Sequence, residues 1–119
     1  MTGTVNILGQ EYTLHTETEK ENPKLKDNVG LCEVFSKRII LDTSVADNDP
    51  DTVENVEEYF HKVLRHEAFH AILFEAGWTD YYHDESLVDA LATLYPKIES
   101  IMNELKKVDI YANSNSRAT

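Results

Sequence analysis

The chain has 119 residues, of which 41% are hydrophobic and 28% are charged, and its formal net charge at pH 7 is −11. The length supports one hydrophobic core, and the composition is that of a globular domain without a membrane span. A strongly acidic chain is unsuited to binding nucleic acid, because Lys and Arg make the contacts to phosphate.

The first 41 residues contain four short segments that favour β-structure. In chain order they are Val5–Leu8, Tyr12–Thr16, Val29–Phe35 and Arg38–Leu41. Gly9 lies between the first two segments and predicts a hairpin turn, whereas the polar residues 20–28, which include Pro23, predict a loop between the pairs. We expect the four segments to form a small, mainly antiparallel sheet.

Two features of the N-terminal part of the chain bear on the cellular compartment of the protein. Residues 1–10 contain no basic residue and no long apolar block, so the sequence does not predict a signal peptide. The single cysteine, Cys32, cannot form an internal disulfide, and its strand-like setting predicts a packing role. Together these features predict a cytoplasmic protein.

Residues 52–76 carry the longest helical pattern of the chain. Asp51 and Glu54 resemble a capping box that starts a helix near Thr52, and Gly77 ends the pattern. The predicted inward face of this helix combines three polar residues with apolar ones: His66, Glu67 and His70 with Val56, Tyr59, Phe60, Val63, Leu73 and Phe74. The predicted outward residues are Glu57, Glu58, Lys62, Arg65 and Glu75.

A second helix is predicted after the aromatic loop of residues 78–83. Asp84 caps it, Glu85 begins it, and Pro96 should kink or divide it, because proline lacks the N–H that a helix interior requires. An apolar stripe follows the proline: Ile98, Ile101, Met102, Leu105 and Val108. We therefore expect an α+β fold with a single domain over residues 1–108 and a flexible tail over residues 109–119.

The functional signal is an H-E-x-x-H motif, which occupies residues 66–70 of the first helix. Residues four apart lie on one helical face, so His66 and His70 can bind the same zinc ion, and Glu67 lies where it can polarise a metal-bound water. Inward-facing ionisable side chains are costly unless they are paired or bind a metal. The motif therefore predicts a zinc site with Glu67 as the catalytic base.

A catalytic zinc commonly has three protein ligands, so one more must come from elsewhere in the chain. Glu85 and Asp89 are four residues apart on one face of the second helix and are both candidates. His83, in the loop before that helix, is a further candidate, because a third histidine completes the site in other zinc peptidases.

Residues 66–89 resemble the gluzincin branch of the zincin metallopeptidases, in which a glutamate on the next helix completes the H-E-x-x-H site. The resemblance implies that Glu85 is the third zinc ligand and that Asp89 supports His66 from behind the site. In its size and in residues 66–96 the chain looks most like the small metallopeptidases that phages and prophages encode. The resemblance implies a minimal zincin-like fold, although this chain lacks the fuller sequence that surrounds the third glutamate in the large gluzincins.

The predicted function is hydrolysis of peptide bonds by a zinc-bound water that Glu67 activates. Tyr82 or His83, and also Tyr81, are candidate donors to the oxyanion, and an extended peptide or protein substrate could bind along the strand of residues 29–35. Two alternatives stay open. The first is a zinc-stabilised binding or regulatory protein without turnover, and the second is an acidic mimic of nucleic acid that inhibits a host protein.

Overall fold

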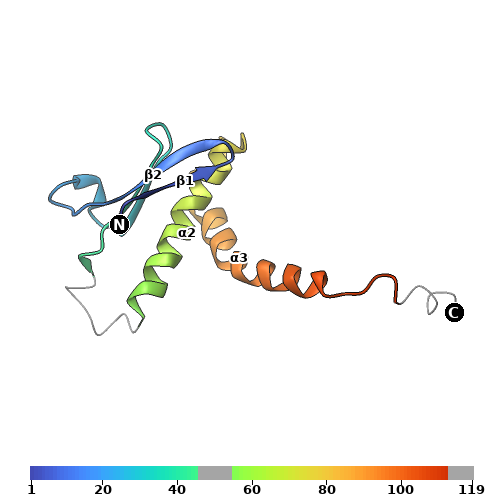
Figure 1. The fold of residues 1–119 in the computed structure, drawn as a ribbon. Coiled ribbons are helices and arrows are strands. Elements are labelled where there is room, and N and C mark those ends of the chain that lie inside the picture. The colour runs from blue at the N-terminus through green and yellow to red at the C-terminus, as the bar shows by residue number, and fades with distance from the viewer. Residues whose placement is uncertain (46–54, 113–119) are drawn as a thin grey trace.

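The computed structural model describes residues 1–45 and 55–112. These residues form a four-stranded mixed sheet from the N-terminal part of the chain, followed by two helices, so the predicted α+β fold class is confirmed. Figure 1 shows the sheet packed on the first helix, α2, while the second half of the other helix, α3, extends away from both. No helix among these residues is long and apolar enough to cross a membrane.

The first two strands, β1 (Gly3–Ile7) and β2 (Gln10–Thr16), form the predicted antiparallel hairpin. Its turn consists of Leu8 and Gly9, which both adopt positive φ angles of 51° and 94°. Two-residue turns of this kind match the right-handed twist of the strands, and glycine adopts a positive φ without steric cost. The prediction of a turn at Gly9 is confirmed.

The second hairpin consists of β3 (Gly30–Glu33) and β4 (Arg38–Leu41), and it is also antiparallel, as predicted. The two hairpins join through a parallel pairing of β2 with β4, which gives the strand order β1-β2-β4-β3. Two of the three pairings are therefore antiparallel, and β3 lies at one edge of the sheet. The predicted loop between the hairpins contains one short 3-10 helix, η1 (Pro23–Leu25).

Helix α2 (Val56–Glu75) begins four residues later than predicted, with Asn55 as its cap. The Asn55 side chain accepts a hydrogen bond from the Glu58 N–H at 3.1 Å, which satisfies one of the free amides of the first turn. The predicted capping box at residues 51–54 lies outside the described residues. The end of the helix agrees with the prediction, because Gly77 has a φ of 88° and its N–H bonds to the Phe74 carbonyl at 3.1 Å.

One hydrophobic core joins the sheet to α2. Ile7, Tyr12 and Ile39 of the sheet and Ala71 of α2 are buried in it, and Cys32 packs against it. Burial, followed by the negative charge of nearby carboxylates, raises the pKa of the Cys32 thiol to about 12. This thiol therefore stays protonated and serves the packing role that the sequence predicts.

The sequence pattern of the helix predicts that Glu75 faces outward, and this prediction was wrong. Its side chain is only 10% exposed and accepts hydrogen bonds from the Tyr12 hydroxyl at 2.6 Å and from Lys37 Nζ at 2.5 Å. The sequence pattern of one helix cannot show these partners, because both belong to the sheet. Glu75 is instead a polar link between α2 and the sheet.

Helix α3 (Glu85–Lys106) begins at the predicted residue, and Asp84 caps it by accepting from the Leu87 N–H at 3.1 Å. Pro96 lies inside the helix and does not divide it, although the helix changes direction near its middle (Figure 1). Of the two expected effects of Pro96, the kink is therefore observed and the division is not.

The proline deprives the Ala92 carbonyl of its usual helical donor, the N–H four residues later. Arg65 of α2 replaces that donor, because its Nε donates to the Ala92 oxygen at 2.9 Å. The sequence prediction that Arg65 faces solvent was therefore wrong, and the residue is half-buried between the two helices. This contact fixes the helices to each other directly beside His66.

The two halves of α3 differ sharply in burial. Val88 and Ala92 are buried, whereas the apolar residues after Pro96 are exposed. The exposed fractions are 43% for Ile98, 53% for Ile101, 50% for Met102, 58% for Leu105 and 54% for Val108. The predicted stripe therefore exists, and among the described residues it is exposed. Of the predicted tail, residues 109–112 are described and residues 113–119 are not.

Candidate metal centre

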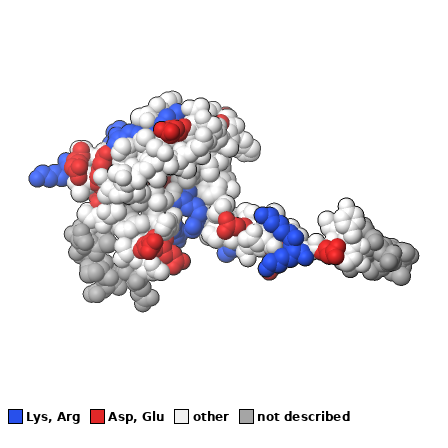
Figure 2. Space-filling model, in the orientation of Figure 1, with Lys and Arg blue, Asp and Glu red and all other residues white. Residues whose placement is uncertain are grey.

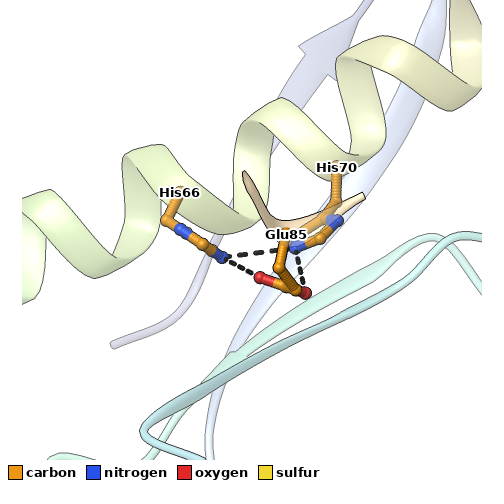
Figure 3. Close-up of side chains that lie close together, drawn as sticks. All are labelled: His66, His70 and Glu85. Carbon is orange, nitrogen blue, oxygen red and sulfur yellow. Dashed lines mark hydrogen bonds and ion pairs between the residues drawn. The ribbon is translucent and has the colours of Figure 1, made fainter. Parts of the chain in front are cut away.

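Three predicted ligands meet where the loop between the helices brings the first turn of α3 against α2. The Glu85 carboxylate lies 3.0 Å from His66 Nε2 through one oxygen and 3.1 Å from His70 Nε2 through the other. The two Nε2 atoms are 3.3 Å apart. Figure 3 shows both rings on one side of α2, with the carboxylate facing them. The spacing of four residues places the rings on this face, and the Asp84 cap places Glu85 at the helix start.

The far nitrogen of each ring is held by a different acceptor. His66 Nδ1 lies 2.9 Å from the Asp89 carboxylate, and His70 Nδ1 lies 2.5 Å from the backbone oxygen of Tyr82. These oxygens only accept hydrogen bonds, so a proton on each Nδ1 would leave each Nε2 free to bind a metal ion. Asp89 thus occupies the supporting position that the resemblance implied.

The cluster has the donor set of a zinc site. The three ligand atoms, two imidazole nitrogens and one carboxylate oxygen, lie within 4.8 Å of one another. Imidazole nitrogens and carboxylate oxygens are common zinc ligands, and one ion could bond to all three atoms. The residues therefore fit zinc, and the supporting contacts at both Nδ1 atoms are those that metal-binding histidines usually have.

Glu67, the candidate base, is buried beside this cluster with an exposed fraction of 8%. Burial raises the pKa of its carboxyl to about 7; the charge of His66 opposes the rise, and the charge of Glu85 adds to it. Strand β3 packs closely over this side chain at Gly30. A Cβ atom on Gly30 would lie 2.7 Å from Val63 Cγ1 and 3.1 Å from Glu67 Cγ, so only glycine fits there without displacement.

The cluster opens into a cleft of about 440 Å³ between α2, α3 and β3. Its other walls are formed by Asn28, Gly30, Leu31, Cys32, Tyr82 and His83. Asp42, the residue after β4, donates its N–H to the Val29 oxygen at 2.8 Å, which shows that the peptide groups of Val29 point toward β4. Because peptide groups alternate along an antiparallel strand, those of Gly30 and Cys32 point away from β4, toward the free edge of the sheet.

The aromatic loop places its three candidate residues differently. Tyr82 and His83 line the cleft, with their ring centroids 3.8 Å apart, but His83 is not among the three residues that form the cluster. Tyr81 is 50% exposed, contacts Trp78 and lines a separate hollow. Of the three candidates for a third ligand, Glu85 lies against both histidines. Asp89 contacts His66 from the far side of its ring, and His83 lines the cleft.

One functional group was missed in the sequence, namely the Tyr82 carbonyl that holds His70. A backbone oxygen carries no residue signature, and its position depends on how the loop closes onto α2. The nearest sequence signal is the shortness of the connection between His70 and Glu85, which forces the intervening loop to pass close to the histidines.

Comparisons with protein-family models, with curated proteins and with solved structures find no match for this chain. The features of this chain that point to a function are therefore the H-E-x-x-H motif and the geometry of the cluster and its cleft.

Proposed function

We propose that this protein is a zinc-dependent metallopeptidase. The observation that carries the proposal is the convergence of His66 Nε2, His70 Nε2 and the Glu85 carboxylate beside the buried carboxyl of Glu67. His66, His70 and Glu85 would hold the ion. Zinc, when bound, would supply Lewis acidity toward a substrate carbonyl and toward water.

The residues around the cluster have distinct tasks in this proposal. Glu67 accepts a proton from the attacking water and returns it to the leaving amine, and a pKa of about 7 suits both transfers near neutral pH. Asp89 and the Tyr82 carbonyl orient the two imidazoles. Tyr82 and His83, whose side chains line the cleft, are the candidate donors to the developing oxyanion.

The free edge of β3 supports a peptide or protein as the substrate. The outward peptide groups of Gly30 and Cys32 offer hydrogen bonds to an extended chain, and the strand forms one wall of the cleft. A peptide paired with β3 would have its backbone beside Glu67 and Glu85. We place this activity in the cytoplasm because a single cysteine suits a reducing compartment.

Zinc content and turnover test the proposal separately. Wild-type protein should hold about one zinc ion per chain, His66→Ala should lose it, and Glu85→Ala should bind it more weakly. Glu67→Gln should keep the zinc and lose cleavage of a peptide library, whereas Glu57→Gln, on an exposed turn of the same helix, should change neither. Full cleavage by Glu67→Gln would remove Glu67 as the base, and the absence of zinc uptake would overturn the site.

A structural zinc site is the second candidate, because the ligands come from two helices that the ion would join. It predicts that zinc raises the midpoint of thermal unfolding while no peptide is cleaved by wild-type protein. In that case Glu67→Gln would have no measurable consequence for the function, which distinguishes a zinc-stabilised binding protein from a peptidase.

A further inference from the structure

The exposed stripe of α3 has the spacing of a coiled-coil seam. Within α3, Leu94, Ile98, Ile101 and Leu105 follow one another at intervals of four, three and four residues, and the same spacing continues backward to Leu91 and Leu87 and forward to Val108, two residues beyond the helix end. Apolar residues that alternate in this way form one narrow face that packs against another helix. From Leu94 onward these side chains are 43–58% exposed.

This seam is distinct from the buried side of α3. Val88 and Ala92 are buried on a different side of the helix, where the Ala92 carbonyl accepts from Arg65 of α2, and Pro96 lies opposite the seam. Figure 1 shows the second half of α3 clear of the sheet and of α2, and Figure 2 shows uncharged surface on it between basic and acidic side chains. A second helix therefore has access to the seam.

We infer that the seam pairs with the same seam of a second copy of this chain, in antiparallel orientation. The charges that flank it specify this partner. When Ile98 lies level with Ile101 of the second copy, Lys97 lies opposite Glu104 of that copy, and twofold symmetry repeats the pair. The same register places Tyr95 opposite Met102 of the second copy and aligns Leu94 with Leu105 of that copy.

Other arrangements bring like charges together. A shift of one heptad in either direction sets Lys97 against Lys97 or Glu104 against Glu104 of the second copy. A parallel, in-register pair leaves Lys97 beside Met102 of the second copy, and the position opposite Glu104 lies beyond the end of α3, so neither charge gains a partner. Opposite charges thus favour one antiparallel register, like charges disfavour the shifted antiparallel registers, and the parallel pair offers no charge pair.

The mass of the full chain in solution is the first test. Sedimentation equilibrium should give twice 13.6 kDa for wild-type protein, and Ile98→Asp with Ile101→Asp should give 13.6 kDa. Circular dichroism and thermal unfolding check that this double variant is folded. A wild-type protein that is monomeric at every concentration would overturn the inference. Sedimentation of this monomer with vesicles of phosphatidylcholine and phosphatidylglycerol would show that the seam binds a membrane instead, and the inference would still be overturned. A dimer that survives the double variant would overturn it too.

Charge exchange tests the register without removing any apolar contact. Lys97→Glu or Glu104→Lys alone should raise the dimer dissociation constant about tenfold, and the combined variant should restore the wild-type value. Lys106→Glu, outside the flanking positions, is the matched control and should leave dimerisation unchanged. If the combined variant is no better than the single ones, Lys97 and Glu104 are not partners and the register is wrong.

Cross-linking tests the orientation. With Cys32 replaced by alanine, Leu94→Cys and Leu105→Cys proteins should form a disulfide when they are mixed and oxidised, because these positions lie level only in the antiparallel pair. Each protein alone should form no such disulfide. Efficient self-cross-linking of Leu94→Cys would instead show a parallel pair and overturn the proposed orientation.

Discussion

His66 contacts one carboxylate through each of its ring nitrogens, and the two contacts serve different purposes. Glu85 lies at Nε2, where the metal would bind, and Asp89 lies at Nδ1, where a carboxylate orients the ring and increases its basicity. Asp89→Ala should therefore keep one zinc ion per chain but weaken its binding by about 10–100-fold. Competition with a fluorescent chelator measures this affinity, and Asp80→Ala, in the exposed loop, is the control. Unchanged affinity in Asp89→Ala would show that His66 needs no such support.

Gly30 has a steric role that is specific to the site. Gly30→Ala should push β3 away from Val63 and Glu67, because the added Cβ would lie 2.7 Å from the valine side chain. We expect a loss of stability of about 1–3 kcal/mol in urea unfolding and a larger proportional loss of turnover than of bound zinc. Gly3→Ala is the matched control, since its Cβ would meet only Leu14 Cδ1, at 3.9 Å. Equal stability of the two variants would contradict the close approach.

At this scale the sequence predicts side chains well and their surroundings poorly. The spacing of His66 and His70 and the cap before Glu85 place three side chains that the structure brings together. The carbonyl that holds His70 and the close approach at Gly30 depend on how a loop and a strand lie against α2. Neither feature has a periodic pattern, so neither could be predicted from the residues alone.

At the scale of the elements, Pro96 and Arg65 act as a pair. Arg65→Ala should destabilise wild-type protein by about 1–3 kcal/mol, because it leaves the Ala92 carbonyl without a donor. In the Pro96→Ala background that carbonyl regains a helical N–H, so the same substitution should cost less. A double-mutant cycle from urea unfolding measures the difference. An identical cost in both backgrounds would mean that Arg65 stabilises the helices through another contact.

The elements themselves follow closely from the sequence where local chemistry determines them. The turn at Gly9, the end of α2 at Gly77 and the cap at Asp84 were all predicted from residue type and position. The parallel pairing of β2 with β4 was not, because it joins strands that are distant in the chain and depends on no local signal. The sequence left open whether Pro96 would kink or divide α3, because the compensating donor, Arg65, lies on another helix.

At the scale of the whole molecule, Glu75 connects α2 to the sheet in a pH-dependent way. Burial alone would raise the pKa of its carboxyl, but hydrogen bonds from Lys37 and Tyr12 and the charge of Lys37 lower it below its ordinary value of 4.5. A lowered pKa in the folded state stabilises the protein above the ordinary value, and this stabilisation is lost as the pH falls through the folded-state pKa.

Glu75→Gln should consequently be less stable than wild type at neutral pH, and the difference should shrink in acid. Thermal unfolding across a pH series measures it, with Glu57→Gln as a control at an exposed position of the same helix. A difference that is constant with pH would show that Glu75 acts through packing rather than through its charge.

The loop between α2 and α3 contains the only tryptophan of the chain, Trp78, in contact with Tyr81. The same loop supplies the Tyr82 carbonyl to His70, so zinc bound at the proposed site would lie beside the loop that carries the indole. Intrinsic fluorescence excited at the indole therefore arises from one place, and that place is the loop between α2 and α3. A zinc titration followed by tryptophan emission would report zinc binding at the proposed site in the unlabelled protein.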